Sequence, residues 1–346
     1  MRRFVLACVL CSSLIACGKS NTGGGDDQAS PDGPPAITGD KYSLSWGPVL
    51  VHAGEENTQC IVVKLSNPAA IKVHQLHNTL GDGSHHVIVY KDDDPAAVEN
   101  TTPTDCQPFA GALNLSGMVA PMMITQKKDD LLTLPDGVAY TLAANQMIRI
   151  EMHFINTTDS DIMAHETSDF YAADPATIQN EASILFIGSP DINIPANQTA
   201  TVHQYFTPSR ANLDLTTAKF FAITGHTHHL GTNVTVATKM TSGGTSTMIY
   251  QPNPFVWSEP ETVTHSPEFT VPTGGGFDFE CDYNNTTSAA VKFGESANDE
   301  MCFFWAYYFP SKGSHVCVHS DSYGNVDICC PDAGPTLCNK LNPPPN

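Results

Sequence analysis

Apolar and polar residues alternate over short distances along most of the chain from Lys41 onward. Such alternation places apolar side chains on one face of a β-strand, and the runs are interrupted by Gly, Pro, Asn and Asp, as at turns. A helical period is not sustained over any useful length. The pattern predicts strands within residues 60–65, 86–90, 146–155, 182–187, 219–223, 234–237, 268–271 and 303–309. Many short strands of this kind predict an all-β fold.

The first residues follow a different pattern. Two arginines, an apolar run and small residues make up residues 1–17, which is the composition of an export signal. Its end, Leu14-Ile15-Ala16-Cys17, resembles the lipobox of bacterial lipoproteins. We therefore expect residues 1–16 to be a lipoprotein signal peptide and Cys17 to be lipidated; an ordinary secretory signal is the alternative. Gly18, where an inner-membrane lipoprotein has Asp, indicates an export route to the outer membrane of a Gram-negative bacterium.

Composition changes again after the signal. Residues 17–40 are rich in Gly, Pro and Asp, which predicts a disordered, flexible tether. Residues 188–197 contain two prolines and no strong periodicity, so they are a candidate domain junction. We expect two tandem antiparallel β-sandwich domains of jelly-roll type over residues 41–190 and 191–310, followed by a Cys-rich tail over residues 311–346.

Overall charge narrows the range of partners. The chain has 346 residues with 16 basic and 36 acidic side chains, a formal net charge of −20. Binding of nucleic acid needs clustered Lys and Arg, so a nucleic-acid partner is excluded. Hydrophobic residues make up 41% of the chain, which excludes disorder throughout. No apolar stretch reaches the roughly 18 residues that span a bilayer, so contact with a membrane is expected through the lipid anchor alone.

The cysteine count fits an exported protein. Of 11 cysteines, Cys8 and Cys11 leave with the signal peptide and Cys17 carries lipid, so 11 − 2 − 1 = 8 remain. An even number in an oxidising compartment predicts four disulfides.

Four of these eight cysteines lie in the tail. Neighbouring cysteines such as Cys329 and Cys330 rarely bond each other, because the geometry of a disulfide needs converging Cβ atoms. Two pairings remain, in each of which Cys317 and Cys338 take one member of the neighbouring pair. A metal site is the alternative interpretation of this cluster.

The 14 histidines include two groups. His226 and His228 are two residues apart, so in a strand both would project from one face and could approach one ion, while His229 would point away. His85 and His86 are adjacent and follow Gly81-Asp82-Gly83-Ser84.

His153 can be placed by strand alternation. Residues 148, 150, 152 and 154 are apolar, so Arg149, Glu151 and His153 share the opposite face and His153 is not a core histidine. Imidazole suits Zn, Cu, Fe and Ni, whereas a thioether selects Cu(I). Most of the 10 methionines are expected to fill the core, and Met301 is the exception because of its neighbours.

The order and approximate spacing of five sequence motifs resemble those of a known family, the ascorbate-dependent type II copper monooxygenases. This family includes the relatives of peptidylglycine α-hydroxylating monooxygenase and dopamine β-monooxygenase. The resemblance covers residues 41–310 and would make the chain a bacterial lipoprotein member. A lone His-His pair is a weak signal, whereas five motifs in order are specific. These motifs lie at residues 84–90, 134–140, 150–154, 225–231 and 299–302.

The resemblance implies two copper ions per chain, one in each domain, facing each other across a solvent-filled cleft. Adjacent residues project to opposite sides of a regular strand, so His85 and His86 can share an ion only if the backbone is irregular, as the preceding glycines permit. The implied ligands are His85, His86 and His153 for the electron-storing copper, and His226, His228 and Met301 for the oxygen-activating copper. The resemblance also implies disulfides between Cys60 and Cys106 and between Cys281 and Cys302.

The implied activity is the hydroxylation of a substrate C–H bond with O2 and ascorbate, or a similar one-electron donor, as cosubstrate. The partners are then O2 and a small-molecule substrate, and we expect a monomer. Hydrogen abstraction needs no side-chain acid or base, so no catalytic residue beyond the metal ligands is expected. The protein would position the reactants and tune the metals.

Departures from the family concern the substrate. Peptide-amidating members hold a carboxylate with Arg, Asn and Tyr at positions that are Thr224, Phe303 and Trp305 here. The carboxylate clamp is therefore missing. Phe303 and Trp305 share a strand face with Met301 and form either an apolar substrate wall or core packing. His77 is a candidate to support a metal ligand. No role is assigned to His52, His74, His165, His203, His265, His315 and His319.

Two other functions are compatible with the same ligands. A copper-binding or copper-buffering outer-membrane lipoprotein could keep them without oxygenase activity. A structural surface protein could use the histidines for zinc, although zinc gains nothing from Met301.

Overall fold

The computed structural model describes residues 39–109, 118–294, 296–334 and 338. These residues lie in one compact unit. The expected signal peptide, most of the tether, the end of the tail and Cys8, Cys11 and Cys17 lie outside the described residues. No helix among those described is long and apolar enough to cross a membrane.

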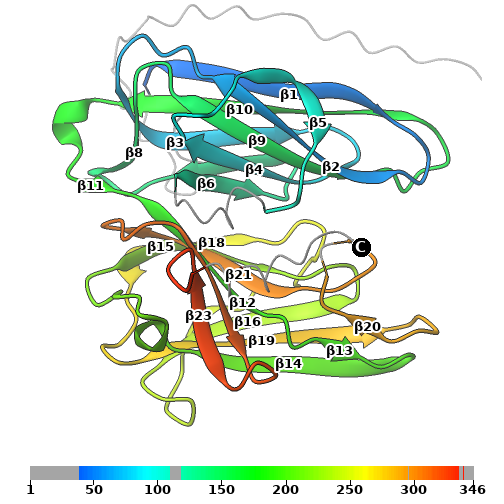
Figure 1. The fold of residues 1–346 in the computed structure, drawn as a ribbon. Coiled ribbons are helices and arrows are strands. Elements are labelled where there is room, and N and C mark those ends of the chain that lie inside the picture. Colours follow the sequence, from blue (N-terminus) through cyan, green and yellow to red (C-terminus); the bar gives the residue numbers. More distant parts are fainter. Residues whose placement is uncertain (1–38, 110–117, 295, 335–337, 339–346) are drawn as a thin grey trace, which may run out of the picture. The chain divides into compact units, whose positions relative to one another are not determined.

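The architecture is all-β, as the alternating pattern predicts, and its strands form two successive sandwiches (Figure 1). One sheet of the first sandwich has the order β1-β10-β3-β8-β11, with β7 also paired to β3. Its strands are β1 (Lys41–Val51), β3 (Ile71–Leu80), β7 (Asp129–Thr133), β8 (Val138–Leu142), β10 (Ile162–Ala173) and β11 (Asn180–Glu181). The other sheet has the order β5-β2-β9-β4-β6, with β2 (Glu56–Lys64), β4 (Ser84–Asp92), β5 (Asn100–Asp105), β6 (Val119–Thr125) and β9 (Met147–Ile155).

In the second sandwich, one sheet has the order β18-β15-β21-β12-β22-β23 and the other the order β14-β19-β16-β17. The first contains β12 (Ser183–Ser189), β15 (Lys219–His226), β18 (Thr262–Phe269), β21 (Cys302–Phe309), β22 (His315–Ser320) and β23 (Val326–Cys330). The second contains β14 (Gln198–Phe206), β16 (Gly231–Lys239), β17 (Thr247–Tyr250) and β19 (Gly276–Asn285). A small pair, β13 (Asn193–Ile194) with β20 (Val291–Lys292), and two 3-10 turns, η1 (Pro175–Thr177) and η2 (Pro208–Ala211), complete the described elements.

The sheets change earlier in the chain than the expected domain junction at residues 188–197. β11 still pairs with β8 of the first sandwich, whereas β12, which begins at Ser183, pairs with β21 and β22 of the second. The tail is also not a separate appendage where it is described, because β22 and β23 are the last strands of a sheet in the second sandwich. The loop after β12 contains prolines, which are typical of domain junctions, although it lies within the second sandwich.

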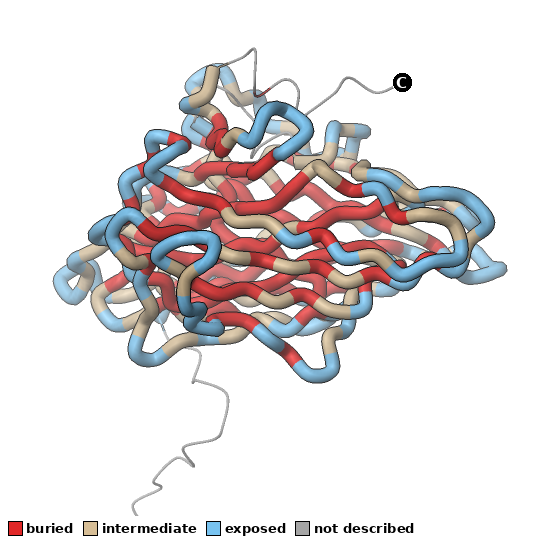
Figure 2. Tube along the Cα trace, turned by 90° about the horizontal axis from the view of Figure 1, so that it is seen from below, coloured by how far each residue is buried: buried red, intermediate tan, exposed pale blue. Residues whose placement is uncertain are grey.

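Buried residues run along the central strands and exposed residues gather in the connections (Figure 2). One core cluster fills the first sandwich, and a second cluster, with Phe220, Phe277 and Phe279, fills the second. The first cluster also includes Trp305 and Tyr307 from β21 of the second sandwich. The Tyr307 hydroxyl accepts a hydrogen bond of 3.1 Å from the Ile124 amide of β6. The two sandwiches therefore share apolar and polar contacts.

Four disulfides join the eight cysteines that the structure describes. Cys60–Cys106 and Cys281–Cys302 are both present, as the resemblance implied. The tail pairs are Cys317–Cys329 and Cys330–Cys338, one of the two arrangements left open by the sequence. Because all four tail cysteines are bonded, they are not free to bind a metal.

Candidate metal centre

His85 and His86 approach one point because the strand that carries them is irregular. In the pairing of β4 with β9, Ser84 lies opposite Phe154 and His86 opposite His153, and the register shifts between Ser84 and His86. His85 is thus an extra residue, a β-bulge, which changes the direction of its side chain relative to a regular strand. The preceding Gly83 has a positive φ of 75°, a conformation that glycine adopts without steric cost.

The bulge brings three imidazoles together. One ring nitrogen from each of His85, His86 and His153 lies within 4.8 Å of the others. The His86 and His153 ring centroids are 5.0 Å apart, and those of His85 and His153 are 5.2 Å apart. Metals take imidazole nitrogens at about 2.0 Å, so an ion bound here would draw the rings slightly closer.

His153 is oriented by Glu56, a residue that the sequence did not single out. His153 Nε2 lies 3.0 Å from Glu56 Oε1, which also accepts a hydrogen bond of 2.9 Å from the Ala297 amide. Its bond to His153 lowers the pKa of Glu56 to about 2. The Glu56 carboxylate therefore accepts a hydrogen bond from Nε2–H of His153. Nδ1 is then the nitrogen available to an ion.

The second pair of histidines is held by a strand end and a turn. Alternation predicted that His226 and His228 lie on one strand. In the structure β15 ends at His226, and His228 lies in the turn before β16. The two ring centroids are nevertheless 5.3 Å apart. Glu300, which is buried, accepts hydrogen bonds of 2.9 Å from the His228 amide and 2.7 Å from the Leu230 amide. Burial raises the pKa of Glu300 to about 7.

Both rings of this second pair are also oriented through Nδ1. His226 Nδ1 lies 2.9 Å from Gln126 Oε1, across the boundary between the sandwiches, and His228 Nδ1 lies 3.1 Å from the Asp299 carbonyl. Since a carbonyl oxygen can only accept, Nδ1 of each ring carries the proton. Nε2 is then the nitrogen that each ring offers to an ion. His229, in contrast, is exposed and bonds the Ala297 carbonyl.

All five imidazoles belong to one cluster. The ring centroid of His85 is 6.1 Å from that of His228 and 6.5 Å from that of His226, and His86 is 6.4 Å from His226. Rings at these separations are in contact, so the expectation of a solvent-filled cleft between the two triads is wrong for this structure. The apolar contacts of β21 with the first core and the Gln126–His226 bond hold the sandwiches together here.

The donor atoms fit a metal ion. Five buried ring nitrogens lack a hydrogen-bond partner, which is uncommon for buried polar atoms. They are His85 Nε2, His86 Nδ1 and Nε2, His153 Nδ1 and His226 Nε2. Burial lowers the pKa of His85 to about 3 and that of His228 to about 4. Burial also lowers the pKa of His86 and His226, and a neutral imidazole is the form that binds metals.

Met301 lies directly before β21, where two contacts fix the backbone. The Tyr283 hydroxyl donates a hydrogen bond of 2.7 Å to the Met301 carbonyl, and the next residue, Cys302, is bonded to Cys281 on β19. Met301 is buried and lines a narrow cavity together with His226. Its thioether is thus on the side of the cluster where a soft ligand would make the site suitable for Cu(I).

The three substrate-pocket candidates are separated by the structure. Phe303 and Trp305 line the cavity beside His226 and Met301, and Trp305 also packs in the first core. Core packing, one of the two interpretations of the sequence, therefore applies to Trp305, which also lines the cavity. Thr224 is not one of the described residues that line the cavity. Its hydroxyl lies 2.8 Å from that of Thr262 on β18. The other described lining residues are Phe109, Phe186, Pro190, Phe293, Val316 and Val318.

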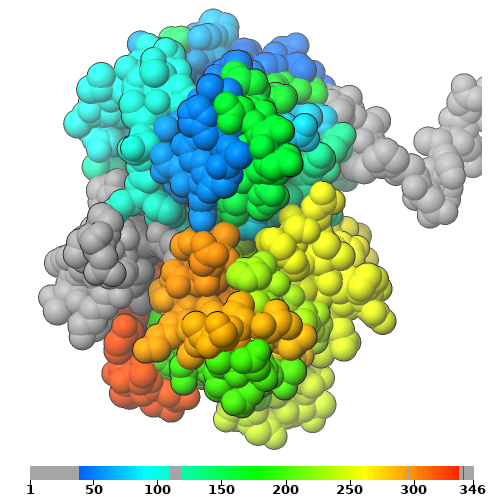
Figure 3. Space-filling view, turned by 90° about the vertical axis from the view of Figure 1, so that its right-hand side faces the viewer, coloured from blue at the N-terminus to red at the C-terminus, as the bar shows by residue number. Residues whose placement is uncertain are grey.

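Trp257 is a further residue that the sequence did not identify. Its ring centroid is 6.0 Å from that of His85 and 6.3 Å from that of His229. It is half-buried in the connection between β17 and β18. Figure 3 shows that the yellow segment around residues 250–265 reaches the surface on the face shown. The distance between the Trp257 and His85 rings places Trp257 beside the cluster.

Most other histidines make pairs away from the cluster. His52, His77, His203, His315 and His319 each lie within 3.2 Å of an aspartate oxygen. His77, the candidate to support a metal ligand, bonds Asp129 at 2.6 Å at the edge of the first sandwich. Side chains that contact the candidate ligands are instead those of Glu56, Gln126 and Glu300. Glu300 alone had a signal, because it stands inside the motif at residues 299–302.

The chain is distantly similar to several solved structures. The chain is similar to Broad Bean Stain Virus at 9% identity and a TM-score of 0.33, with 82% of this chain and 93% of that chain covered. For a VP2 subviral particle of infectious bursal disease virus the values are 10%, 0.18, 79% and 72%. For the tandem CBM22 domain of Xyn10C from Paenibacillus barcinonensis they are 9%, 0.16, 79% and 98%. TM-scores this low do not establish a shared fold.

Comparison by sequence is more informative. No curated protein matches the chain. The segment that contains His226, His228 and Met301, residues 180–327, matches the family model of the copper type II ascorbate-dependent monooxygenase, C-terminal domain.

Proposed function

We propose that the protein is a copper-dependent monooxygenase that hydroxylates a substrate C–H bond with O2 and two electrons from ascorbate or a similar one-electron donor. The observation that carries this proposal is the cluster of five buried imidazoles, in which unpartnered ring nitrogens come from both sandwiches. The family match of residues 180–327 supports copper as the metal. A thioether beside the cluster supports it further, because zinc has no preference for this ligand.

We assign two copper positions. His85, His86 and His153 would hold one ion, and His226, His228 and Met301 would hold the other. Copper in these positions would supply the one-electron redox steps that O2 reduction requires. The reaction is R–H + O2 + 2 e⁻ + 2 H⁺ → R–OH + H2O, in which ascorbate is oxidised.

The roles of the protein side chains follow from their contacts. Glu56 and Gln126 fix the tautomers of His153 and His226, so each ring presents one defined nitrogen to its ion. Glu300 holds the turn that carries His228. Burial of the cluster excludes water, which would otherwise compete with substrate and shorten the life of reactive species.

Export and membrane attachment are part of the proposal. We propose that residues 1–16 are removed, that Cys17 carries the lipid, and that the monomeric protein is held at the outer membrane by this anchor alone. Incorporation of labelled fatty acid into the wild-type protein but not into Cys17→Ala would support the anchor. Labelling that persists in the variant would overturn it.

The test of the activity is O2 consumption by copper-loaded protein with ascorbate and a panel of C–H substrates. Uptake that rises with substrate, yields an equal amount of alcohol and collapses in Met301→Ala supports the proposal. Met248→Ala is the matched control, because Met248 is 49% exposed on β17. Copper binding without substrate-coupled uptake would overturn oxygenase activity and favour a copper-buffering lipoprotein. Zinc in the protein as isolated from the periplasm would favour a structural zinc site.

A further inference from the structure

We infer that the cavity beside His226 and Met301 receives an uncharged, apolar group of the substrate. The substrate class is then a neutral aromatic or aliphatic compound, and not a carboxylate, a peptide C-terminus or an amine. The inference rests on the proposed function, because it takes the metal position at His226 as the reaction centre. There the substrate exchanges one C–H bond for C–OH, while O2 accepts two electrons and two protons and its second oxygen leaves as water.

One row of paired residues on neighbouring strands forms one side of the cavity. His226 on β15 lies opposite Phe303 on β21, Phe303 lies opposite Gly188 on β12, and Gly188 lies beside Val318 on β22. This row crosses four adjacent strands, which are about 4.8 Å apart. A group lying along the row therefore extends from the metal-binding histidine toward Val318.

Glycine is needed in the middle of this row. A Cβ atom at position 188 would lie 2.3 Å from ring atoms of Phe303, so only glycine lets that ring lie across β12. The neighbouring row is formed by Trp305, Phe186 and Val316, which lie opposite each other on the same three strands. Two apolar rows, not a polar clamp, thus face the cavity.

Among the described residues, the lining contains no charged side chain. Apart from the imidazole of His226, every described residue that lines the cavity is apolar. Beyond the reach of an ion at His226 and Met301, a carboxylate or ammonium would lose its hydration without gaining a partner, which costs several kcal/mol. Since about 1.4 kcal/mol corresponds to a factor of ten in affinity, neutral compounds should bind more than tenfold better than charged ones of the same shape.

The size of the cavity limits the bound group. Its volume of about 40 Å³ is far below the roughly 300 Å³ or more of a site for a drug-sized ligand. Each water needs about 10 to 15 Å³ of such space, so the cavity holds the equivalent of a few waters. We therefore infer that a small apolar end of the substrate enters it, such as an alkyl group or the edge of one ring.

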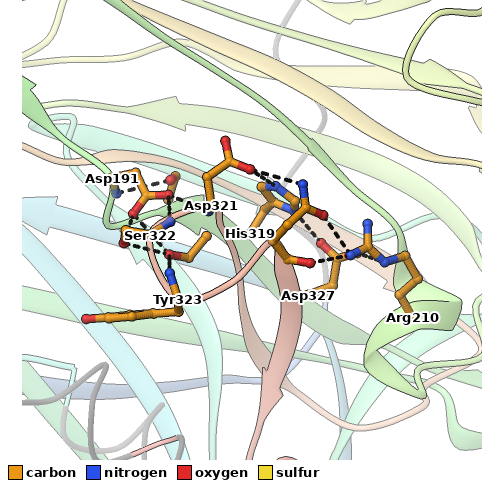
Figure 4. A network of polar contacts seen from close by, with 10 residues as sticks. Asp191, Arg210, His319, Asp321, Ser322, Tyr323 and Asp327 are labelled. Carbon is orange, nitrogen blue, oxygen red and sulfur yellow. Dashed lines mark hydrogen bonds and ion pairs between the residues drawn. The ribbon is translucent and has the colours of Figure 1, made fainter.

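The Val316 and Val318 wall is anchored by the network in Figure 4. Asp191, next to the lining residue Pro190, accepts hydrogen bonds of 3.0 Å from the Ser320 hydroxyl and 2.6 Å from the Asp321 amide at the end of β22. On the same hairpin, His319 Nδ1 lies 2.7 Å from Asp327 Oδ1. The strand that carries Val316 and Val318 is thus tied to the loop that contains Pro190 and Asp191.

The test compares three ligands of similar shape and different charge. Toluene, benzoate and benzylamine are titrated calorimetrically into the copper-loaded protein, which is kept reduced by ascorbate in the absence of O2. No turnover then occurs, and the copper is Cu(I), which prefers soft ligands to carboxylate or amine. We expect toluene to bind at least tenfold more tightly than either charged compound. Equal or tighter binding of benzoate or benzylamine would overturn the inference.

Two variants localise the binding. Val318→Phe fills the cavity and should weaken toluene binding at least tenfold, whereas the matched control Val98→Phe, at a position 79% exposed, should not. Phe303→Ala enlarges the cavity and should improve binding of naphthalene relative to toluene, which gives a test if Val318→Phe fails to fold. Unchanged binding in a folded Val318→Phe, or an unchanged preference in Phe303→Ala, would overturn the inference.

Failure of the inference differs from failure of the proposed function. If toluene binds selectively but no C–H compound is hydroxylated, the cavity assignment stands and the oxygenase proposal fails. If charged compounds are hydroxylated in preference to neutral ones, the oxygenase stands and the substrate class is wrong.

Discussion

Gln126 and His226 are joined by a bond of 2.9 Å between Oε1 and Nδ1, although they are 100 residues apart and belong to different sandwiches. Gln126 directly follows β6, and its side chain reaches the last residue of β15. The first sandwich therefore helps to orient a histidine that we assign to the metal position of the second. Partners that orient a metal ligand commonly change metal affinity or activity by about 10- to 100-fold when removed.

We expect Gln126→Leu to reduce substrate-coupled O2 uptake by about 10- to 100-fold, because His226 loses the acceptor that fixes its tautomer. Gln126→Glu keeps an acceptor and should retain more activity. The electron paramagnetic resonance spectrum of Cu(II) should change in Gln126→Leu. The control is Gln251→Leu at an exposed position. A Gln126→Leu protein with the wild-type spectrum and rate would remove Gln126 from the site.

Glu56 plays the corresponding part for His153. We expect Glu56→Gln to weaken copper binding at His85, His86 and His153 by about 10- to 100-fold, because the amide is a weaker acceptor for the His153 proton. Copper titration measures the affinity. Asp161→Asn, which alters the exposed pair of Asp161 with His52, is the matched control. Equal affinities in wild type and Glu56→Gln would contradict this role.

The Cys281–Cys302 disulfide should stabilise both the fold and the Met301 position. It closes a loop with a sequence separation of 21, so its removal in Cys281→Ala/Cys302→Ala should lower the free energy of unfolding by about 3 kcal/mol. Copper affinity at His226, His228 and Met301 should fall as well. Removing Cys60–Cys106 is the comparison, since it should cost stability but spare this position. Equal copper affinities in the two double variants would show that the disulfide does not position Met301.

Glu166 should make stability depend on pH. Burial raises its pKa in the folded protein to about 8 from 4.5. Between about pH 4.5 and pH 8 the unfolded chain releases this proton while the folded protein keeps it. The free energy of unfolding therefore falls as pH rises through this range, by up to about 1.4 kcal/mol per pH unit.

Denaturant unfolding of Glu166→Gln across this range tests the assignment. The variant should lose the Glu166 part of the pH slope, because glutamine does not titrate. Glu259→Gln, at an exposed position, should keep the wild-type slope. If Glu166→Gln has the same slope as wild type, another group causes the dependence.

The sequence predicts much of this fold for local reasons. Alternation locates β2, β4, β9 and β21, because one face of each is apolar and packs in a core. It also places His153 on the face of β9 away from the first core. It misses β10, in which polar residues such as Glu166 and Ser168 occupy buried positions, and it also misses β1.

The contacts that complete the site are not local. Alternation cannot show that the face of His153 is covered by residues of the second sandwich, or that Gln126 reaches His226. The glycines before His85 allow an irregular backbone but do not require one. The bulge itself depends on the register with the partner strand β9, which the sequence of β4 does not show. The turn that carries His228 depends on Glu300, which is 72 residues away. Each of these features needs the tertiary structure.

The sharing of the first core by β21 and β22 has a consequence for biosynthesis. Trp305, Tyr307 and Val316 pack into a core whose other members lie mostly between residues 46 and 186. In an exported chain, the first sandwich crosses the inner membrane before these three residues do. Until then part of its apolar surface is uncovered, so a chain halted before β21 should need a chaperone to avoid aggregation. A gene cut between the sandwiches should likewise give an insoluble first half.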